Sequence, residues 1–544
     1  MYNNNIEHAA LDEIGPKPGA TEGQPVESLV TLHDDGRVHR GVWQRTPGTF
    51  PSARGRAAAV VGPLLRDRAF VGGRWIEADD GASFAVSDPA TGAVVGRVPA
   101  LGAAETRRAI DSAAGAFGRW AERPAAQRGR LLRTWADRLV ERAEALATLI
   151  VLEQGKPLAE ARAEVAYAAA YLEWFGEEAK RAYGETIPAP ERDRRLIVVK
   201  QPVGVGAGIT PWNFPAAMVA RKVAPALAAG CPIVIKPAEQ TPLTALALAA
   251  IAEEAGLPPG LLHVVTTDRG GAPAVGRELT SNRAVRKLSF TGSTPVGKAL
   301  ATGCAGGVKR VSLELGGNAP FIVFDDADLD AAVDGLLVAK LRNAGQTCVA
   351  ANRILVHAAV HDELVDRFAT AVARLRVGDG LDDGTDLGPL IDARAGEKVA
   401  GHLADALDRG ATLVAGGDHD GPWFSPAIVT GVTPGMRVAS EETFGPLAAI
   451  TRFDDEDQAI ALANGTPFGL VAYVYTRDAG RVWRAGEALE VGMVGVNTGV
   501  VSTEVAPFGG VKESGIGREG SRHGLDEWLD LKYMAMGGAG RSLV

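Results

Sequence analysis

The pattern of hydrophobic and polar positions separates a polar beginning from a regularly patterned remainder. Residues 1–56 are polar, rich in Gly and Pro, and free of strand or helix periodicity, which predicts a mobile extension. The folded part is expected to begin near Leu65. Long segments of Ala, Leu, Glu and Arg predict helices over 103–116 and 125–152, packed outside a sheet.

Short apolar runs then alternate with helical segments. A run at 232–235 is followed by a helical pattern over 243–255 and by a second run at 261–265. A further predicted strand, 285–290, leads into Ser293-Thr294-Pro295, where Ser293 or Thr294 can cap a helix whose first turn accepts proline. This alternation predicts a parallel, doubly wound sheet, a fold that binds nucleotides beyond its strand ends.

A second region of strands and helices is predicted from Val311 to about Gly517. Its clearest strands are 321–324 and 353–357, and its clearest helix is 329–341. The fold class is therefore predicted as α/β. More than one domain is expected, because 544 residues exceed the usual size of one hydrophobic core.

Composition and charge narrow the classes of function. Hydrophobic residues make up 46% and charged residues 23%, which is typical of a soluble globular protein. The net charge is -9 and basic residues form no long run, which argues against nucleic acid as a partner. Apolar stretches such as 243–252 fall short of the roughly 18 residues of a membrane span. Three cysteines and an N-terminus unlike a signal peptide favour a cytoplasmic location.

Cys348 is the first candidate for chemistry. It ends the segment Gly345-Gln346-Thr347-Cys348, just beyond a predicted helix, where a turn can present a thiol to a cleft. The commoner reading of a lone cysteine is a buried packing residue, and Cys231 and Cys304 are assigned that role. The position of Cys348 alone leaves both readings open.

Two polar residues could serve such a nucleophile. Glu314 lies between Leu313 and Leu315, so strand alternation points it away from them; apolar surroundings would raise its pKa and suit a general base, although a salt-bridged Glu is commoner. Asn213 follows Pro211-Trp212 and precedes Phe214-Pro215, and this stiff segment could hold its amide toward an oxyanion, or form an ordinary turn.

Two other features are set aside. The glycine-rich segment 204–208 lacks the spacing of a dinucleotide fingerprint. The nine histidines form no cluster with ligand spacing, so no metal is predicted.

Seven motifs taken together resemble the aldehyde dehydrogenase superfamily from about Leu65 to the C-terminus. They are Pro211–Pro215, Lys236–Glu239, Phe290–Ser293, Leu313–Gly317, Gly345–Cys348, Glu442–Pro446 and Pro507–Gly510. The resemblance implies a Rossmann-like NAD-binding domain over 65–183 and 202–314, an α/β catalytic domain over 315–517, and a small β oligomerisation element from 184–201 and 518–544. It also implies a homodimer or homotetramer, and it does not cover residues 1–56.

The same resemblance implies a mechanism. Cys348 would be the nucleophile, Glu314 the general base, and Asn213 with the Cys348 backbone N–H the oxyanion hole. The thiolate would add to an aldehyde, hydride would pass to NAD, and the remaining thioester would be hydrolysed by a water that Glu314 deprotonates.

Cofactor contacts follow from the matched motifs, and they are Trp212, Lys236, Glu239, Gly292, Ser293, Glu442 and Phe444. Ser293 would meet the pyrophosphate near a helix start. Glu239 would hydrogen-bond free ribose hydroxyls and repel a 2′-phosphate, which predicts NAD in preference to NADP.

Within the superfamily, 171–175 and 489–497 resemble succinate-semialdehyde dehydrogenases. That resemblance implies that Arg221, Arg342 and Ser502 grip the distal carboxylate of a short semialdehyde. A packing salt bridge is the alternative for either arginine. Ala350 replaces a second cysteine found in some relatives, so no disulfide switch is expected. The alternatives to this activity are a dehydrogenase that transfers the acyl group to coenzyme A and a non-catalytic binding protein with the same fold.

Overall fold

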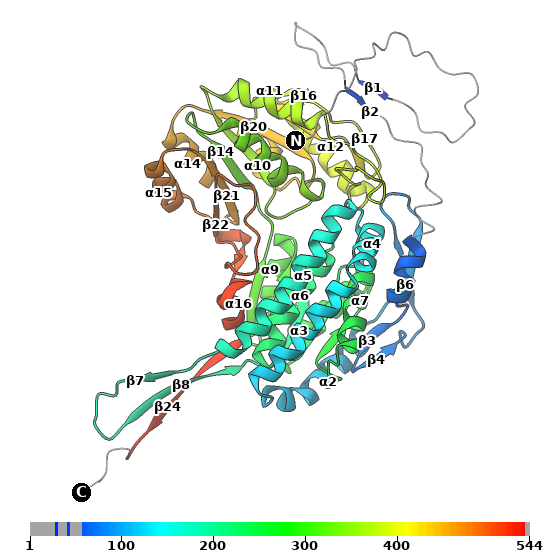
Figure 1. Ribbon diagram of the computed structural model, residues 1–544, viewed down its shortest axis with the longest axis vertical. Helices are drawn as coiled ribbons and strands as arrows, with labels where there is room; N and C mark the ends of the chain where they lie inside the picture. Colours follow the sequence, from blue (N-terminus) through cyan, green and yellow to red (C-terminus); the bar gives the residue numbers. More distant parts are fainter. Residues whose placement is uncertain (1–27, 31–40, 44–56, 539–544) are drawn as a thin grey trace. The chain divides into compact units, whose positions relative to one another are not determined.

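The computed structural model describes residues 28–30, 41–43 and 57–538 and separates into two units, 1–52 and 53–544. In the first unit, strand β1 (Ser28–Val30) pairs antiparallel with β2 (Gly41–Trp43). The rest of the predicted N-terminal extension lies outside the described residues. Everything below concerns the second unit (Figure 1).

The first large sheet has the order β23-β13-β12-β9-β10-β11-β3-β4. The five strands from β13 to β11 are parallel, which confirms the predicted doubly wound sheet. The strands are β3 (Ala69–Val71), β4 (Arg74–Ile76), β9 (Val205–Ile209), β10 (Ile233–Lys236), β11 (Leu262–Val264), β12 (Val285–Thr291), β13 (Arg310–Glu314) and β23 (Gly515–Ile516). Chain order runs outward from β9 in both directions, so the topology switches at the centre of the sheet.

Helices connect and cover this sheet. They are α2 (Ala103–Ala121), α3 (Ala125–Glu141), α4 (Ala143–Gln154), α5 (Leu158–Glu178), α6 (Pro215–Ala229), α7 (Pro242–Glu254), α8 (Ala272–Ser281) and α9 (Thr294–Ala305). The single helix predicted over 125–152 is wrong, because the backbone of Arg142 leaves the helical region (φ -102°, ψ 12°) and separates α3 from α4. Ser293 is the N-cap residue of α9, one of the two positions that the sequence predicted.

The glycine-rich segment 204–208 forms most of strand β9, in the middle of the sheet. A Cβ on Gly206 would overlap the ring of Trp528, and a Cβ on Gly208 would overlap the end of Ile235. These glycines therefore permit close packing rather than phosphate binding.

The second large sheet has the order β16-β19-β20-β15-β14-β21-β22. Its strands are β14 (Ala319–Val323), β15 (Ala351–His357), β16 (Thr412–Ala415), β19 (Ala427–Thr430), β20 (Leu447–Phe453), β21 (Val471–Tyr475) and β22 (Met493–Val496). Its helices are α10 (Leu329–Leu341), α11 (His361–Val372), α12 (Ala393–Asp408), α13 (Arg437–Ser440), α14 (Glu456–Asn464) and α15 (Ala479–Ala488). Helix α10 has the predicted bounds, and Asp328 caps it by accepting from the Ala331 N–H.

A third, small sheet contains β7 (Glu185–Ile187), β8 (Arg195–Pro202) and β24 (Leu529–Met536), in the order β24-β8-β7. We call it the arm, because its far end extends away from the two large sheets (Figure 1). Helix α16 (Ser521–Asp526) contacts α5 and α6. Strand β23 joins the first sheet although it lies within 315–517, so the predicted domain borders stay predictions.

The remaining elements are short. They are β5 (Ser83–Ser87) with β6 (Val94–Pro99), β17 (His419–Asp420) with β18 (Trp423–Phe424), and the 3-10 turns Gly62–Leu64, Ala179–Arg181, Arg342–Gly345 and Lys512–Ser514. Of the helices that the structure describes, none combines the length and the apolar character needed to cross a membrane.

Candidate active site

The carboxyl ends of the parallel strands meet at one edge of the first sheet, and most predicted site residues lie there. Trp212 and Asn213 follow β9, Lys236 ends β10, Gly292 and Ser293 follow β12, and Glu314 ends β13. An open parallel sheet binds its ligands at this edge, close to the point where the strand order switches.

Cys348 reaches the site from the second sheet. It follows α10 and the turn Arg342–Gly345, in which Asn343 (φ 53°), Ala344 (φ 52°) and Gly345 (φ 74°) are left-handed. Such a run redirects the chain sharply after the helix, at a cost in strain for the two residues that are not glycine. Of the three cysteines only Cys348 is partly exposed, while Cys231 and Cys304 are buried as predicted.

The surroundings of Cys348 keep its thiol protonated at rest. Burial raises the pKa of Cys348 to about 12, and the positive charge of Arg221 opposes this shift. The carboxyls of Glu442 and Glu314 raise the same pKa, and Arg342 lowers it. Four predicted site residues therefore act electrostatically on this sulfur, and a proton acceptor is needed before it can attack.

Glu314 is only 3% exposed, with Leu313 and Leu315 buried beside it. Neither of its carboxylate oxygens has a hydrogen-bond partner in the described part of the chain. Burial raises the pKa of Glu314 well above its usual value, as the sequence predicted, and the negative charge of Glu519 raises it further. A carboxyl group in such surroundings binds a proton more strongly than an exposed one, as a general base must.

Glu519 and Lys222 form a buried cluster beside Glu314 that the sequence prediction missed. Glu519 lies 2.9 Å from Arg221 Nε and 2.6 Å from Lys222 Nζ, and Lys222 also donates to Thr291 Oγ1 at 2.7 Å. The signal was present in the sequence, because two adjacent cations on an otherwise apolar helix require a buried carboxylate partner.

Arg221, predicted to bind substrate, is held from several sides. Its guanidinium lies 3.8 Å from the centroid of the Phe508 ring and 5.7 Å from that of Tyr171. The ion pair with Glu519 is the packing salt bridge that the sequence left open. Even so, Nη2 of Arg221 has no hydrogen-bond partner among the described residues. Arg221 can therefore hold its place and still offer one donor to an anion.

The other two predicted substrate residues are more open. Arg342 is partly exposed, and its guanidinium lies 5.5 Å from the centroid of the Phe214 ring. Ser502 is partly exposed on the segment between β22 and β23.

Asn213 contacts the segment that carries the nucleophile. Its Nδ2 donates to the carbonyl of Gln346 at 2.9 Å, two residues before Cys348. An amide nitrogen carries two hydrogens, so the second one can donate to another group. The Asn213 side chain therefore lies against the segment that carries Cys348, and its oxyanion role stays a prediction.

The two cofactor residues predicted in the second region lie in a tight turn. Glu442 accepts a hydrogen bond from the Gly317 N–H at 3.0 Å, and burial raises the pKa of Glu442 to about 7. Phe444 is left-handed (φ 58°) and meets Trp212 edge-on at 5.5 Å. Two residues of α12 that the prediction missed support this turn: Lys398 donates to the Glu442 carbonyl at 2.6 Å, and His402 lies 3.2 Å from Thr443 Oγ1.

The sheet edge fits a dinucleotide. Ser293 is exposed at the N-terminus of α9, where backbone N–H groups favour a phosphate. Lys236 Nζ lies 3.9 Å from a carboxylate oxygen of the partly exposed Glu239, so a cation and an anion stand next to each other for ribose hydroxyls. No group of three or more His, Cys, Asp or Glu within the described ranges could hold a metal.

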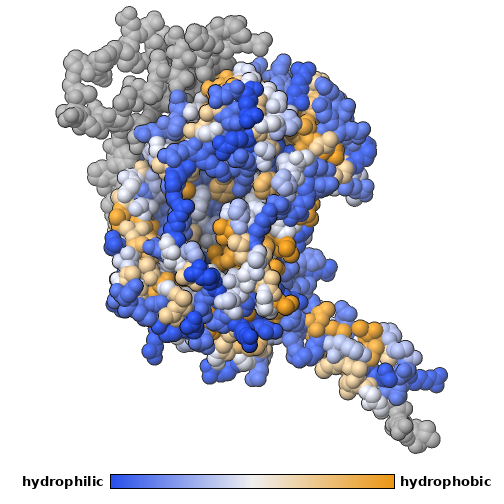
Figure 2. Space-filling model, turned by 180° about the vertical axis from the view of Figure 1, so that it is seen from behind, coloured by the Kyte–Doolittle hydropathy of each residue, from blue (hydrophilic) through white to orange (hydrophobic). Residues whose placement is uncertain are grey.

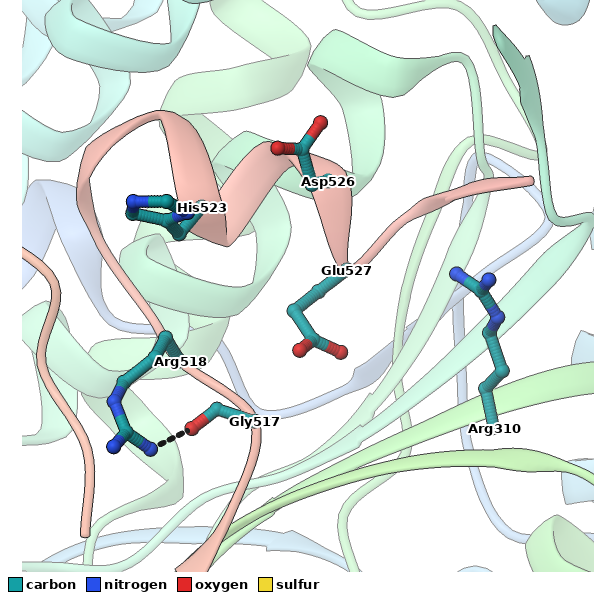
Figure 3. A pocket seen from close by; sticks show the side chains of 6 residues that line it. All are labelled: Arg310, Gly517, Arg518, His523, Asp526 and Glu527. Atoms are coloured by element: carbon teal, nitrogen blue, oxygen red, sulfur yellow. Dashed lines mark hydrogen bonds between the residues drawn. The ribbon is translucent and has the colours of Figure 1, made fainter. Parts of the chain in front are cut away.

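A separate polar pocket lies where β13 meets the C-terminal segment, and none of the predicted site residues lines it. It is lined by Arg310, Gly517, Arg518, His523, Asp526 and Glu527 (Figure 3). Arg518 donates to the carbonyls of Gly510 and Gly517, and its positive charge lowers the pKa of Glu314. Arg518 therefore connects the pocket electrostatically to the site.

Comparison with known proteins identifies the group to which this chain is similar. Residues 75–534 match the aldehyde dehydrogenase family. A glutarate-semialdehyde dehydrogenase of Pseudomonas aeruginosa is 56% identical over 478 residues, which cover 87% of this chain and 98% of that protein. A succinate-semialdehyde dehydrogenase of Escherichia coli, whose name specifies NADP(+), is 56% identical over 477 residues. These cover 87% of this chain and 98% of that protein.

A solved structure gives the same result for the fold. The succinate-semialdehyde dehydrogenase from Burkholderia pseudomallei aligns with a TM-score of 0.86 at 56% identity, over 87% of this chain and 98% of that one. The family match and this coverage agree with the strand-end site that contains Cys348. The chain therefore belongs to the aldehyde dehydrogenase family, and it oxidises an aldehyde to a carboxylic acid with a nicotinamide dinucleotide.

Proposed function

We propose that this enzyme is an NAD-dependent dehydrogenase of short aldehydes that carry a terminal carboxylate, such as succinate semialdehyde. One observation supports this most: a partly exposed cysteine, Cys348, is influenced at once by the cations Arg221 and Arg342 and by the carboxyl of Glu314. In this proposal Cys348 is the nucleophile, Glu314 the base, and the two arginines the anion-binding groups of one site.

The residues of the chain divide the work as follows. Cys348 gives its thiol proton to solvent and Sγ adds to the aldehyde carbon, and the developing oxyanion accepts hydrogen bonds from Asn213 Nδ2 and the Cys348 backbone N–H. Lys236, Glu239, Ser293 and Glu442 would hold the dinucleotide, which would accept the hydride that the Cys348 adduct expels as it becomes a thioester. Glu314 then takes a proton from the water that attacks the thioester, and the acid leaves.

Glu239 supports a preference for NAD. Its carboxylate is partly exposed beside Lys236, where it can accept from ribose hydroxyls and would repel a 2′-phosphate. The similar Escherichia coli enzyme carries NADP(+) in its name, so the preference has to be measured on this chain. Initial rates with each dinucleotide, for the wild type and Glu239→Ser, would test it. We expect the ratio of the rate with NADP to the rate with NAD to be about tenfold higher in the serine variant than in the wild type, which corresponds to roughly 1.4 kcal/mol.

The aldehyde class is tested by an NADH-forming screen. Aldehydes with and without a terminal carboxylate, matched in length, are offered to the wild type and to Cys348→Ala as a blank. Higher kcat/KM for the carboxylated member of each pair is the expected result, and equal values would refute the carboxylate grip. Coenzyme A added to the same assay should not raise the rate, because Glu314 provides the base for hydrolysis.

The arm supports an assembly of identical chains. Its strand β24 exposes Leu531 (71%) and Tyr533 (59%), and β7 exposes Ile187 (42%). Figure 2 shows apolar surface along the arm. Apolar side chains exposed next to unpaired strand edges are typical of surfaces that another chain covers. A homodimer or homotetramer is expected by light scattering. The cytoplasmic location stays a prediction.

A further inference from the structure

Lys156 is a buried cation for which the mechanism above has no use. It lies in the turn between α4 and α5, and its Nζ lies 2.6 Å from Glu164 of α5. The side chains of both residues are 0% exposed. A charge in such a place needs a reason, because removing two ions from water costs several kcal/mol each and their attraction often fails to exceed that cost.

The pair holds the backbone from which the Asn213 side chain projects. Lys156 Nζ donates to the Asn213 carbonyl at 2.8 Å and lies 3.8 Å from the centroid of the Phe214 ring. Glu164 Oε1 accepts from the N–H groups of Ala216 at 2.8 Å and Ala217 at 3.2 Å, in the first turn of α6. The chain is thus fixed at Asn213 and again three and four residues later.

The same carbonyl is also joined to the nucleophile segment. Asn343 Nδ2 donates to the Asn213 carbonyl at 3.1 Å, and Gln154 Nε2 donates to Asn343 Oδ1 at 2.9 Å. The Asn343 N–H donates to the carboxylate of Glu160, with its nearer oxygen at 2.8 Å. Residues 154–164 therefore contact both the segment of Asn213 and the left-handed turn before Cys348.

An oxyanion donor works only if it already stands at the place where negative charge develops. A displacement of about 1 Å at a reacting centre can cost on the order of 100-fold in rate. Hydrogen bonds on the Asn213 carbonyl and on the N–H groups that follow it fix the backbone there, and the bond from Asn213 Nδ2 to the Gln346 carbonyl restrains the side chain. A buried ion pair is weak evidence for added stability. The contacts of this pair instead indicate that it holds the backbone of the site in place.

We propose that Lys156 and Glu164 are positioning residues for carbonyl addition, which hold the Asn213 amide where the oxyanion forms. This inference rests on the role proposed above for Asn213. It concerns the addition step and predicts no change in the affinity for the dinucleotide.

The test uses the full-length double variant Lys156→Met with Glu164→Gln. It removes both charges while nearly keeping side-chain volume, and the glutamine still accepts from the Ala216 N–H. Arg162→Met is the matched control. Arg162 lies on helix α5, as Glu164 does, but its ion pair with Glu144 is exposed. Two rates are compared: the NADH burst with succinate semialdehyde, and alkylation of Cys348 by iodoacetamide.

Alkylation is the discriminating measurement, since that reaction needs the thiolate but develops no oxyanion. We expect the burst rate of the double variant to fall about 10- to 100-fold while alkylation changes less than about twofold. The dissociation constant for NAD and the melting temperature are measured alongside. A burst equal to that of Arg162→Met, or an equal fall in both rates, would overturn the inference.

Two further variants separate the possible failures. Lys156→Arg keeps a cation opposite Glu164 but alters the donor at the Asn213 carbonyl. We expect its burst rate to fall more than its alkylation rate, though by less than in the double variant. This measurement remains possible if the double variant does not fold. Asn213→Ala should show the selective loss in full. If Asn213→Ala leaves the burst intact, the proposed function of Asn213 fails. If only the Lys156 variants leave it intact, this inference alone fails.

Discussion

Two sides of the active site differ in burial and in backbone conformation. The first sheet and α6 supply Glu314 and Arg221, each 3% exposed and each in regular secondary structure. The second sheet supplies Cys348 and Arg342, which are partly exposed and lie in or directly after a left-handed turn. Charge and proton affinity are set on the buried side, whereas the partly exposed side carries the residues proposed to meet the aldehyde.

The largest effect is expected on the buried side. Glu314→Gln should release one equivalent of NADH and then turn over roughly 10²- to 10⁴-fold more slowly, because the thioester lacks its base. Stopped-flow measurement of burst and steady state checks this. Glu513→Gln, which alters an exposed ion pair with Lys298, is the control. Unimpaired steady-state turnover would mean that another group activates the water.

A substitution on the open side should act on selectivity. Arg342→Ala is expected to weaken the use of carboxylated aldehydes by roughly 2 to 5 kcal/mol, because the carboxylate loses a charged partner. Uncharged aldehydes of equal length should be nearly unaffected, and they provide the control in the same assay. Similar losses on both substrates would remove the carboxylate grip and leave Arg342 a packing role against Phe214.

The pH dependence tests the electrostatics of the buried side. The pKa of Glu314 is raised by burial and by the charge of Glu519, so Glu519→Gln should lower it. The thioester-hydrolysis step needs ionised Glu314, and the acid limb of its pH profile should therefore move to lower pH. The variant also leaves Arg221 and Lys222 unpaired, which lowers the same pKa. A shift to higher pH would contradict this reading.

The smallest effect concerns the strained turn. Ala344→Gly should change the melting temperature little. Glycine adopts the left-handed backbone at φ 52° without strain, and the strain removed offsets the greater conformational entropy of glycine in the unfolded chain. Ala332→Gly, in the middle of helix α10, should destabilise by roughly 0.5 to 1 kcal/mol. Equal losses in the two variants would show that the turn is not strained.

The sequence predicted elements on both sides of the site and missed contacts between distant segments. Hydrophobic runs identified the buried strands β10 and β12, and the bounds of α10 were predicted to the residue. The break at Arg142 was missed because residues on both sides of it favour helix. Glu519 was missed because its partners, Arg221 and Lys222, lie about 300 residues earlier in the chain, and periodicity reports only on neighbours. Support of the cofactor turn by α12 was missed for the same reason.

Completion of the arm depends on β24, a strand far along the chain from β8. Lys200 of β8 pairs with Asp526 across 326 residues of sequence, and β24 adds to β8 directly afterwards. During synthesis from the ribosome, one edge of β8 therefore stays open until the chain has been made beyond Leu529. A product truncated before Leu529 would keep that edge unpaired, with its backbone groups available to other nascent chains, and aggregation would compete with assembly.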